Sequence, residues 1–121
     1  LLAGGIRVGK SGKVLLVTAA LDGVPVDVAR NMTDMIKEKN PAAVAVLAVS
    51  GDGKLNFLAA AGKEAVALGA HAGKLVGAVA AVTGGKGGGR PDNAMAGGRD
   101  IDQIPEALST AEVVLGGMLK D

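Results

Sequence analysis

The chain has 121 residues, of which 49% are hydrophobic and 21% charged, a composition typical of one globular domain and not of a disordered segment. The formal net charge of +1 gives no global basic field, and the absence of cysteine excludes disulfides and thiolate metal sites. Because the apolar runs are too short for a membrane span and the N-terminus lacks a signal-peptide pattern, we expect a cytoplasmic protein without membrane contact.

Two apolar runs, over residues 13–19 and 43–49, are typical of strands covered on both faces. Between them, Pro25 suits the first turn of a helix and Asn40-Pro41 suits its end. Apolar residues of this helix at i, i+4, i+7 and i+8 predict one buried stripe: Val28, Met32, Met35 and Ile36. The order strand, helix, strand predicts a βαβ unit with parallel strands and a right-handed crossover.

A hairpin is predicted next. Residues 50–53 read Ser-Gly-Asp-Gly and carry the Asp-Gly turn signal, so residues 54–60 should return as an antiparallel strand. Phe57 on that strand is available for the core. A short helical turn then follows over residues 62–68, which a glycine at position 69 breaks.

The C-terminal part predicts two helices around a glycine-rich segment. Residues 72–82 form a buried helix, with Gly84 as the residue after its C-cap. Residues 93–97 could return to the sheet as a short strand. Asp102 would cap a last helix over residues 103–120. One face of that helix is apolar: Leu108, Ala111, Leu115 and Met118.

The predicted fold is therefore α/β, with a mixed parallel/antiparallel sheet of about four to five strands and helices packed on it. Residues 1–13 should be the end of an upstream connector or an edge strand, and residues 14–121 a single globular domain. Since the chain begins at Leu1 without Met, we expect it to be a piece of a longer protein.

The residues around each candidate catalytic motif do not provide the structure that its chemistry needs. Gly4 to Ser11 matches the P-loop pattern G-x-x-x-x-G-K-[ST], but that chemistry needs a strand before the loop and a helix after it, whereas here a strand follows. His71 is the single histidine and lies at a helix start, which favours a capping or surface role. The acidic residues are scattered singly. We therefore predict no catalytic residue, metal site or cofactor in this domain.

The segment "GGKGGGRPDNAMAGG", residues 84–98, holds seven glycines, one lysine and one arginine. One interpretation is a flexible surface loop. The other is a contact surface, in which phosphate or ribose lies on bare main-chain N–H groups with cations beside it. Composition alone leaves the two open.

The same segment resembles the glycine-rich signature of the DHH-associated domain near the C-terminus of bacterial alanyl-tRNA synthetases. Residues 28–36, "AVAVLAVSGDGKLNFLAAAGKEA", "HAGKLVGAVAAVTGG" and the last helix follow that family's order and spacing from about residue 13. The resemblance implies a non-catalytic tRNA-binding module that contacts the elbow of tRNA(Ala), where the D- and T-loops meet, and helps aminoacylation and editing act on one tRNA.

For the parent protein the resemblance implies an alanine-tRNA ligase that uses ATP, magnesium and zinc outside this domain. The implied partners are tRNA(Ala), the rest of the synthetase chain and a second copy, through a helical segment upstream. The RNA-binding candidates are the glycine segment and a flanking basic rim: Gly84, Gly85, Lys86, Gly87, Gly88, Gly89, Arg90, Pro91, Gly97 and Gly98, with Lys63, Lys74 and Arg99.

Three alternatives stay open. The module could belong to a stand-alone alanyl-tRNA editing hydrolase, or it could be a protein-interaction or dimerisation domain. It could also be an accessory domain of a DHH-type phosphoesterase. In those phosphoesterases the glycine run is typically followed by His, whereas Arg90-Pro91 follows Gly89 here, which favours the synthetase branch.

Overall fold

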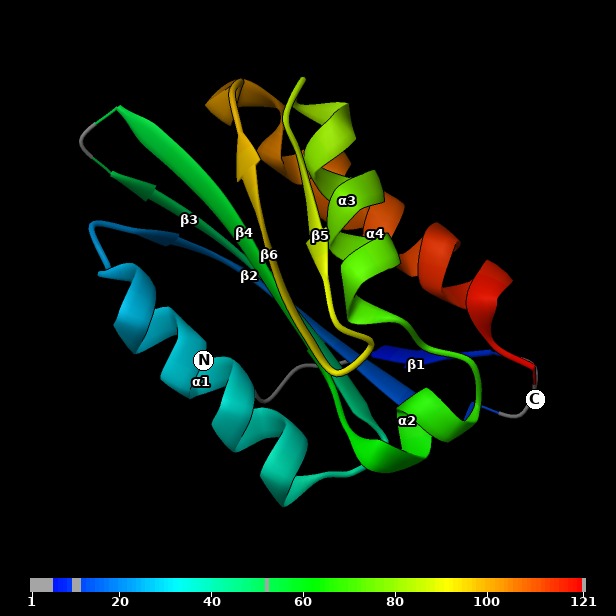
Figure 1. Cartoon of the computed structure of the whole chain (residues 1–121). Helices are drawn as coiled ribbons and strands as arrows, with labels where there is room; N and C mark the ends of the chain where they lie inside the picture. Colours follow the sequence, from blue (N-terminus) through cyan, green and yellow to red (C-terminus); the bar gives the residue numbers. More distant parts are fainter. Residues whose placement is uncertain (1–5, 10–11, 52, 121) are drawn as a thin grey trace.

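The chain folds around a mixed parallel and antiparallel β-sheet (Figure 1). The computed structural model describes residues 6–9, 12–51 and 53–120. In chain order the elements are β1 (Ile6–Val8), β2 (Val14–Asp22), α1 (Val26–Lys39), β3 (Ala43–Gly51), β4 (Lys54–Ala61), α2 (Lys63–Ala67), α3 (Ala72–Val82), β5 (Lys86–Gly89), β6 (Asn93–Gly98), the 3₁₀ turn η1 (Ile101–Gln103) and α4 (Ile104–Met118). The described strands are ordered β1-β2-β3-β4-β6-β5, so β1 and β5 are opposite edges. The α/β class is confirmed, with six strands in place of four to five.

The predicted βαβ unit is confirmed, since β2 and β3 are parallel and α1 connects them. β3 is buried along residues 43–49, as its apolar run predicts. The expectation that β2 is covered on both faces is wrong, because Thr18 and Ala20 are exposed. They lie on the same face of β2 as Leu16, which packs into the core beside α3 and α4, so these helices do not cover the far end of that face.

The stripe predicted on α1 is half right, because Met32 and Ile36 are partly buried but Val28 and Met35 are not. Val28 and Met35 are 44% and 53% exposed, whereas the buried residues of the helix are Ala29 and Thr33. α1 packs on β3 and β4, with Ala29 buried in the contact and Val26 and Met32 packed around it. The Thr33 hydroxyl donates to the Arg30 carbonyl at 2.7 Å, so its burial leaves no unpaired donor.

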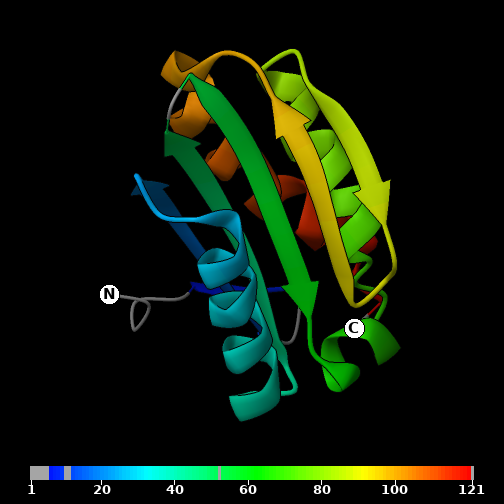
Figure 2. The ribbon, with the colours of Figure 1, turned by 60° about the vertical axis from the view of Figure 1, so that its left-hand side comes forward.

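The larger core lies between the sheet and the helices α3 and α4. Phe57, on the predicted antiparallel strand β4, is fully buried in it. Its neighbours include Leu75 and Val79 of α3 and Leu115 of α4. Figure 2 shows the result: α1 lies over one face of the sheet, and α3 and α4 lie over the other.

Both ends of α3 are capped as the sequence predicts. His71 Nδ1 accepts a hydrogen bond from the Lys74 N–H at 3.1 Å. At the other end Gly84 has φ +82°, and its N–H donates to the Ala81 carbonyl at 3.0 Å. The N–H of Gly85 donates to the Ala80 carbonyl at 2.9 Å. This pair of bonds is the Schellman motif, which turns the chain from α3 into the glycine segment.

The cap predicted for the last helix, Asp102, is wrong by two residues, because the capping side chain is that of Asp100. The Asp100 carboxylate accepts from the Asp102 N–H at 3.0 Å and starts η1, which leads into α4. Pro105 occupies the first turn of α4, where its missing N–H costs nothing. The apolar face of α4 is centred on Ala107, Ala111 and Leu115, which are fully buried.

The structure has a strand at the position where a P-loop would need a phosphate-binding loop. Residues 6–8 form β1, which pairs antiparallel with β2 at the edge of the sheet. The Gly4, Gly5, Lys10 and Ser11 positions of the pattern lie outside the described residues. The extended conformation of residues 6–8 supports the rejection of an NTP site, because that site needs a loop curled around the phosphates.

Candidate nucleic-acid interface

The glycine segment forms a β-hairpin at the edge of the sheet. β5 pairs antiparallel with β6, which in turn pairs with β4. The turn is closed by the Arg90 N–H, which donates to the Asn93 carbonyl at 3.0 Å. All four residues of β5 are exposed. A return strand was predicted at β6, but β5 was not, because four residues reading Lys-Gly-Gly-Gly carry no β-propensity signal.

Close backbone packing explains most of these glycines. A Cβ on Gly73 of α3 would meet the carbonyl oxygen of Gly89, and one on Gly77 would lie 2.9 Å from that of Gly87. Helix α3 therefore rests directly on the backbone of β5, as Figure 1 shows. A Cβ on Gly87 would lie 2.5 Å from the Ala96 Cα, and one on Gly85 would meet the Gly97 carbonyl oxygen.

Two glycines of the hairpin have no such restriction. A Cβ on Gly97 would have no neighbour within 4 Å. One on Gly88 would have only the Gly73 carbonyl oxygen, at 3.7 Å, which is an ordinary van der Waals distance. Neither has a positive φ. Their lack of a side chain is therefore not required by packing or backbone conformation, and it leaves bare main chain on the surface.

The strand register places Gly97 on the side of the sheet away from α3, whereas the Cβ position of Gly88 lies toward α3, near the Gly73 carbonyl oxygen. Residues directly opposite each other on paired antiparallel strands point to the same side. Leu58 of β4 is buried against α1, and Met95 lies opposite Leu58. The next row on the same side joins Asn56, Gly97 and Lys86.

We call this surface the open face, defined by Asn56, Lys86, Met95 and Gly97. Figure 2 shows α1 lying beside β6 and β5, not over them, on this side of the sheet. Lys86 and Gly97 are exposed, and Met95 is 38% exposed. On the opposite side, Phe57, Ala96 and Gly87 form a row that faces α3 and the core.

The candidate residues gather in two hollows at the two ends of the hairpin. The glycine hollow is lined by Gly84, Gly85, Lys86, Gly97, Gly98 and Arg99. The turn groove holds Gly88, Gly89 and Arg90, together with α1 residues that include Arg30, Asp34 and Lys37. The glycine hollow combines bare backbone with two cations, Lys86 and Arg99. The turn groove balances its cations with carboxylates, those of Asp34, Glu38 and Asp92.

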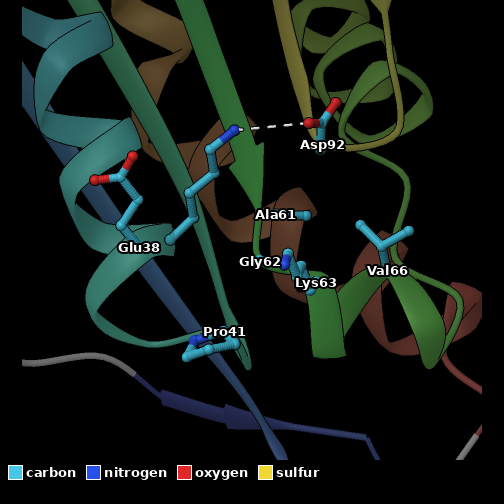
Figure 3. A pocket seen from close by; sticks show the side chains of 8 residues that line it. Glu38, Pro41, Ala61, Gly62, Lys63, Val66 and Asp92 are labelled. Atoms are coloured by element: carbon cyan, nitrogen blue, oxygen red, sulfur yellow. Dashed lines mark ion pairs between the residues drawn. The ribbon is translucent and has the colours of Figure 1, made fainter.

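Lys63 and Lys74 lie outside both hollows. Lys63 lines a separate pocket between the C-terminal end of α1 and α2, shared with Lys37, Glu38 and Asp92 (Figure 3). Lys74 is exposed in the first turn of α3. The expected basic rim is therefore divided among different surfaces, and only Arg99 adjoins the glycine hollow.

Main-chain donors next to the hollows are already engaged within the domain. At the start of α3, the N–H of Ala72 donates to the Pro91 carbonyl at 2.8 Å and that of Gly73 to the Arg90 carbonyl at 3.0 Å. The third N–H, that of Lys74, donates to His71. The helix N-terminus thus holds the hairpin turn and offers no anion site, so an anion here would meet side-chain cations.

Helix α1 contributes three residues that the sequence analysis missed. Arg30, Asp34 and Lys37 follow one side of the helix at i, i+4 and i+7 and reach the hairpin. Asp34 Oδ1 accepts from Asn93 Nδ2 at 3.4 Å, and Lys37 Nζ lies 3.7 Å from a carboxylate oxygen of Asp92. The dashed line that ends at Asp92 in Figure 3 marks this ion pair. Their helical spacing was the available signal, but it named no partner in a segment about 60 residues away.

Other kinds of site are not found in the described part of the chain. No group of three or more His, Cys, Asp or Glu side chains there could hold a metal ion. Over residues 6–9, 12–51 and 53–120, no helix is long and apolar enough to cross a membrane.

Comparison with solved structures identifies the architecture. The C-Ala domain of alanyl-tRNA synthetase from Aquifex aeolicus superposes with a TM-score of 0.81 at 29% sequence identity, over 94% of this chain and 99% of that chain. A pGpG-specific phosphodiesterase from Vibrio has a TM-score of 0.55 at 14% identity, over 93% of this chain and 36% of that chain. The second likeness shows the fold alone.

Sequence relatives agree with the structural match. The alanine–tRNA ligase of Shouchella clausii is 46% identical over 103 residues, and that of Alkaliphilus oremlandii is 44% identical over 108 residues. The alignments cover 85% and 89% of this chain but 12% of each relative, so the chain spans about an eighth of their length. Residues 12–117 match the family model of the DHHA1 domain. The chain belongs to the DHHA1 domain family.

Proposed function

We propose that the chain is a non-catalytic tRNA-binding module of an alanine–tRNA ligase and contacts the elbow of tRNA(Ala). The observation that carries this proposal is the glycine hairpin, which presents bare backbone and cations on the exposed edge of the sheet. The similarity to alanine–tRNA ligases and to a C-Ala domain supports the choice of parent. It favours a ligase over a stand-alone editing hydrolase.

Folded RNA suits this surface better than a single strand. Phe57 is the single aromatic residue of the chain, and it is fully buried. Proteins that bind single strands stack the bases on exposed aromatic rings, and this chain has none to offer. Recognition would therefore depend on phosphate, ribose and shape, as it does for folded RNA.

Within the parent protein, the module would hold one tRNA while the aminoacylation and editing domains act on it. Alanine attachment with ATP, and the magnesium and zinc expected of the parent, would belong to domains outside this chain. The partners would be tRNA(Ala), the rest of the synthetase and, through an upstream helical segment, a second copy. The site of action would be the cytoplasm.

Titration of the chain with tRNA(Ala) transcript tests the proposal, with fluorescence anisotropy at roughly 50 and 200 mM salt. The double variant Lys86→Ala/Arg90→Ala should weaken binding and lower the salt slope by about one to two units, because each lost phosphate contact removes about one. The matched control is Arg7→Ala/Lys13→Ala, which removes one exposed Arg and one exposed Lys near the opposite edge of the sheet.

Failure of the wild-type chain to bind tRNA(Ala) would overturn the proposal. Equal losses in the two double variants would instead show that the hairpin is not the contact surface. Sedimentation at several protein concentrations without RNA separates this function from dimerisation. Self-association together with indifference to tRNA would favour the interaction module.

A further inference from the structure

We infer that the open face, and not only the hairpin at its edge, is the surface that meets RNA, with Arg30 of α1 and Asn56 of β4 as contact residues. Arg30 would bind a phosphate, and Asn56 a ribose hydroxyl or an exposed base edge. This inference rests on the proposed function and names the residues of the same site. Both side chains lie far in sequence from the glycine segment.

Arg30 reaches across to the open face and lacks a carboxylate partner there. Its Nη2 lies 3.8 Å from the sulfur of Met95, a weak acceptor. In the described part of the chain, the ion pairs are those of Lys37 with Asp34 and Asp92, and Arg30 takes part in neither. The guanidinium therefore keeps its charge and most of its donors for an incoming phosphate, whose geometry it matches.

Asn56 and Lys86 lie on the two strands that flank β6, at the position where β6 has no side chain. Both lie opposite Gly97, one on β4 and the other on β5. Two strand spacings separate them, which is roughly 10 Å between Cα atoms. No atom lies within 4 Å of the position that a Gly97 Cβ would take. A sugar–phosphate segment could thus rest on Gly97 with an amide on one side and an ammonium on the other.

The chemistry of the open face favours a polyanion over a protein partner. Its one large apolar side chain is Met95, whereas the buried centres of protein interfaces are rich in aromatic and apolar residues. Arg30 and Lys86 provide positive charge on the face, and Arg90 and Arg99 lie at its two ends. The Asn56 amide adds both donors and acceptors, which suit a 2′-hydroxyl.

The test measures tRNA(Ala) binding by single variants across a salt series. Arg30→Gln should weaken binding about five- to tenfold at roughly 0.1 M salt and reduce the salt slope by about one unit. Arg30→Lys should keep the slope and recover part of the affinity, because the charge remains while the planar fork is lost. Asn56→Ala should weaken binding without changing the slope, since no charge is removed.

Arg7→Gln is the matched control, because Arg7 is equally exposed but lies on β1, at the other edge of the sheet. Thermal unfolding of each variant should match the wild type, which separates contact from folding. If the wild-type chain binds tRNA(Ala) and Arg30→Gln behaves as Arg7→Gln does, the inference is wrong while the proposed function stands. If the wild-type chain does not bind, the proposed function falls first.

Discussion

At the scale of single residues, the glycines of the hairpin divide into two groups. Gly85, Gly87 and Gly89 lie where a Cβ would press on neighbouring backbone or on the side chain of an alanine. Gly88 and Gly97 lie where a Cβ would find room. The first group is needed for the fold. In the second group the lack of a side chain is not required by packing inside the domain, so it can instead make room for a ligand.

Gly97→Ala should therefore separate binding from stability. We expect the free energy of unfolding to stay within about 0.5 kcal/mol of the wild type, as for surface substitutions in general. The affinity for tRNA(Ala) should fall roughly fivefold, or about 1 kcal/mol, because the methyl group lifts the ligand off the strand. Urea unfolding and anisotropy titration measure the two effects. Unchanged affinity would remove Gly97 from the interface.

At the scale of elements, the packing of α3 on β5 decides the shape of the candidate site. The helix lies on the hairpin through Gly73 and Gly77, and its first N–H groups hold the carbonyls of Arg90 and Pro91. On the other side, α1 holds the same turn through Asp34 and Lys37. The glycine hairpin is thus fixed from both faces, which a flexible loop would not be.

Gly73→Ala tests the contact between the helix and the strand. Alanine is the better helix former by about 1 kcal/mol, but here its Cβ would meet the Gly89 carbonyl. We expect a net loss of about 1–3 kcal/mol in unfolding free energy, which is typical of overpacking. Gly117→Ala in α4 is the matched control, because its Cβ meets nothing within 4 Å and stability should hold or rise. Equal effects in urea unfolding would contradict the packing described.

At the scale of the whole molecule, one core between the sheet and helices α3 and α4 supports the open face from behind. Phe57 is its largest fully buried side chain. Phe57 lies on β4 beside Ala96 of β6, so the core and the open face share the same strands. A substitution that disturbs the packing of the core should therefore also disturb the open face, because both lie on the same strands.

Phe57→Ala should cost about 3–5 kcal/mol of unfolding free energy, because it leaves a cavity in a core of small aliphatic residues. A domain of this length has about 6–18 kcal/mol in total, so the loss is a large fraction. Phe57→Leu should recover part of it by filling most of the volume. Chemical denaturation measures both variants, and a loss below about 1 kcal/mol in Phe57→Ala would show that Phe57 does not anchor the core.

The sequence by itself determined the elements whose signals are local. The strands at the apolar runs, β2 and β3, the antiparallel return of β4 and the cap of α3 at His71 depend on neighbouring residues, and all are present. It missed features that depend on distant partners. The stripe on α1 was predicted from the spacing of its larger apolar residues, yet the fully buried residues of the helix are Ala29 and Thr33, because the position of the sheet decides which side of the helix is covered.

Only the tertiary structure decided what the glycine segment is. The strand β5 has no propensity of its own and exists because β6 pairs with it and α3 lies on it. Sequence alone also could not place Arg30 and Asn56 beside Gly88 and Gly97, since cross-strand register and helix position bring them together. Turns, caps and single strands can be predicted because they depend on neighbouring residues. A surface shared by one helix and three strands depends on how these elements pack, which the sequence does not show directly.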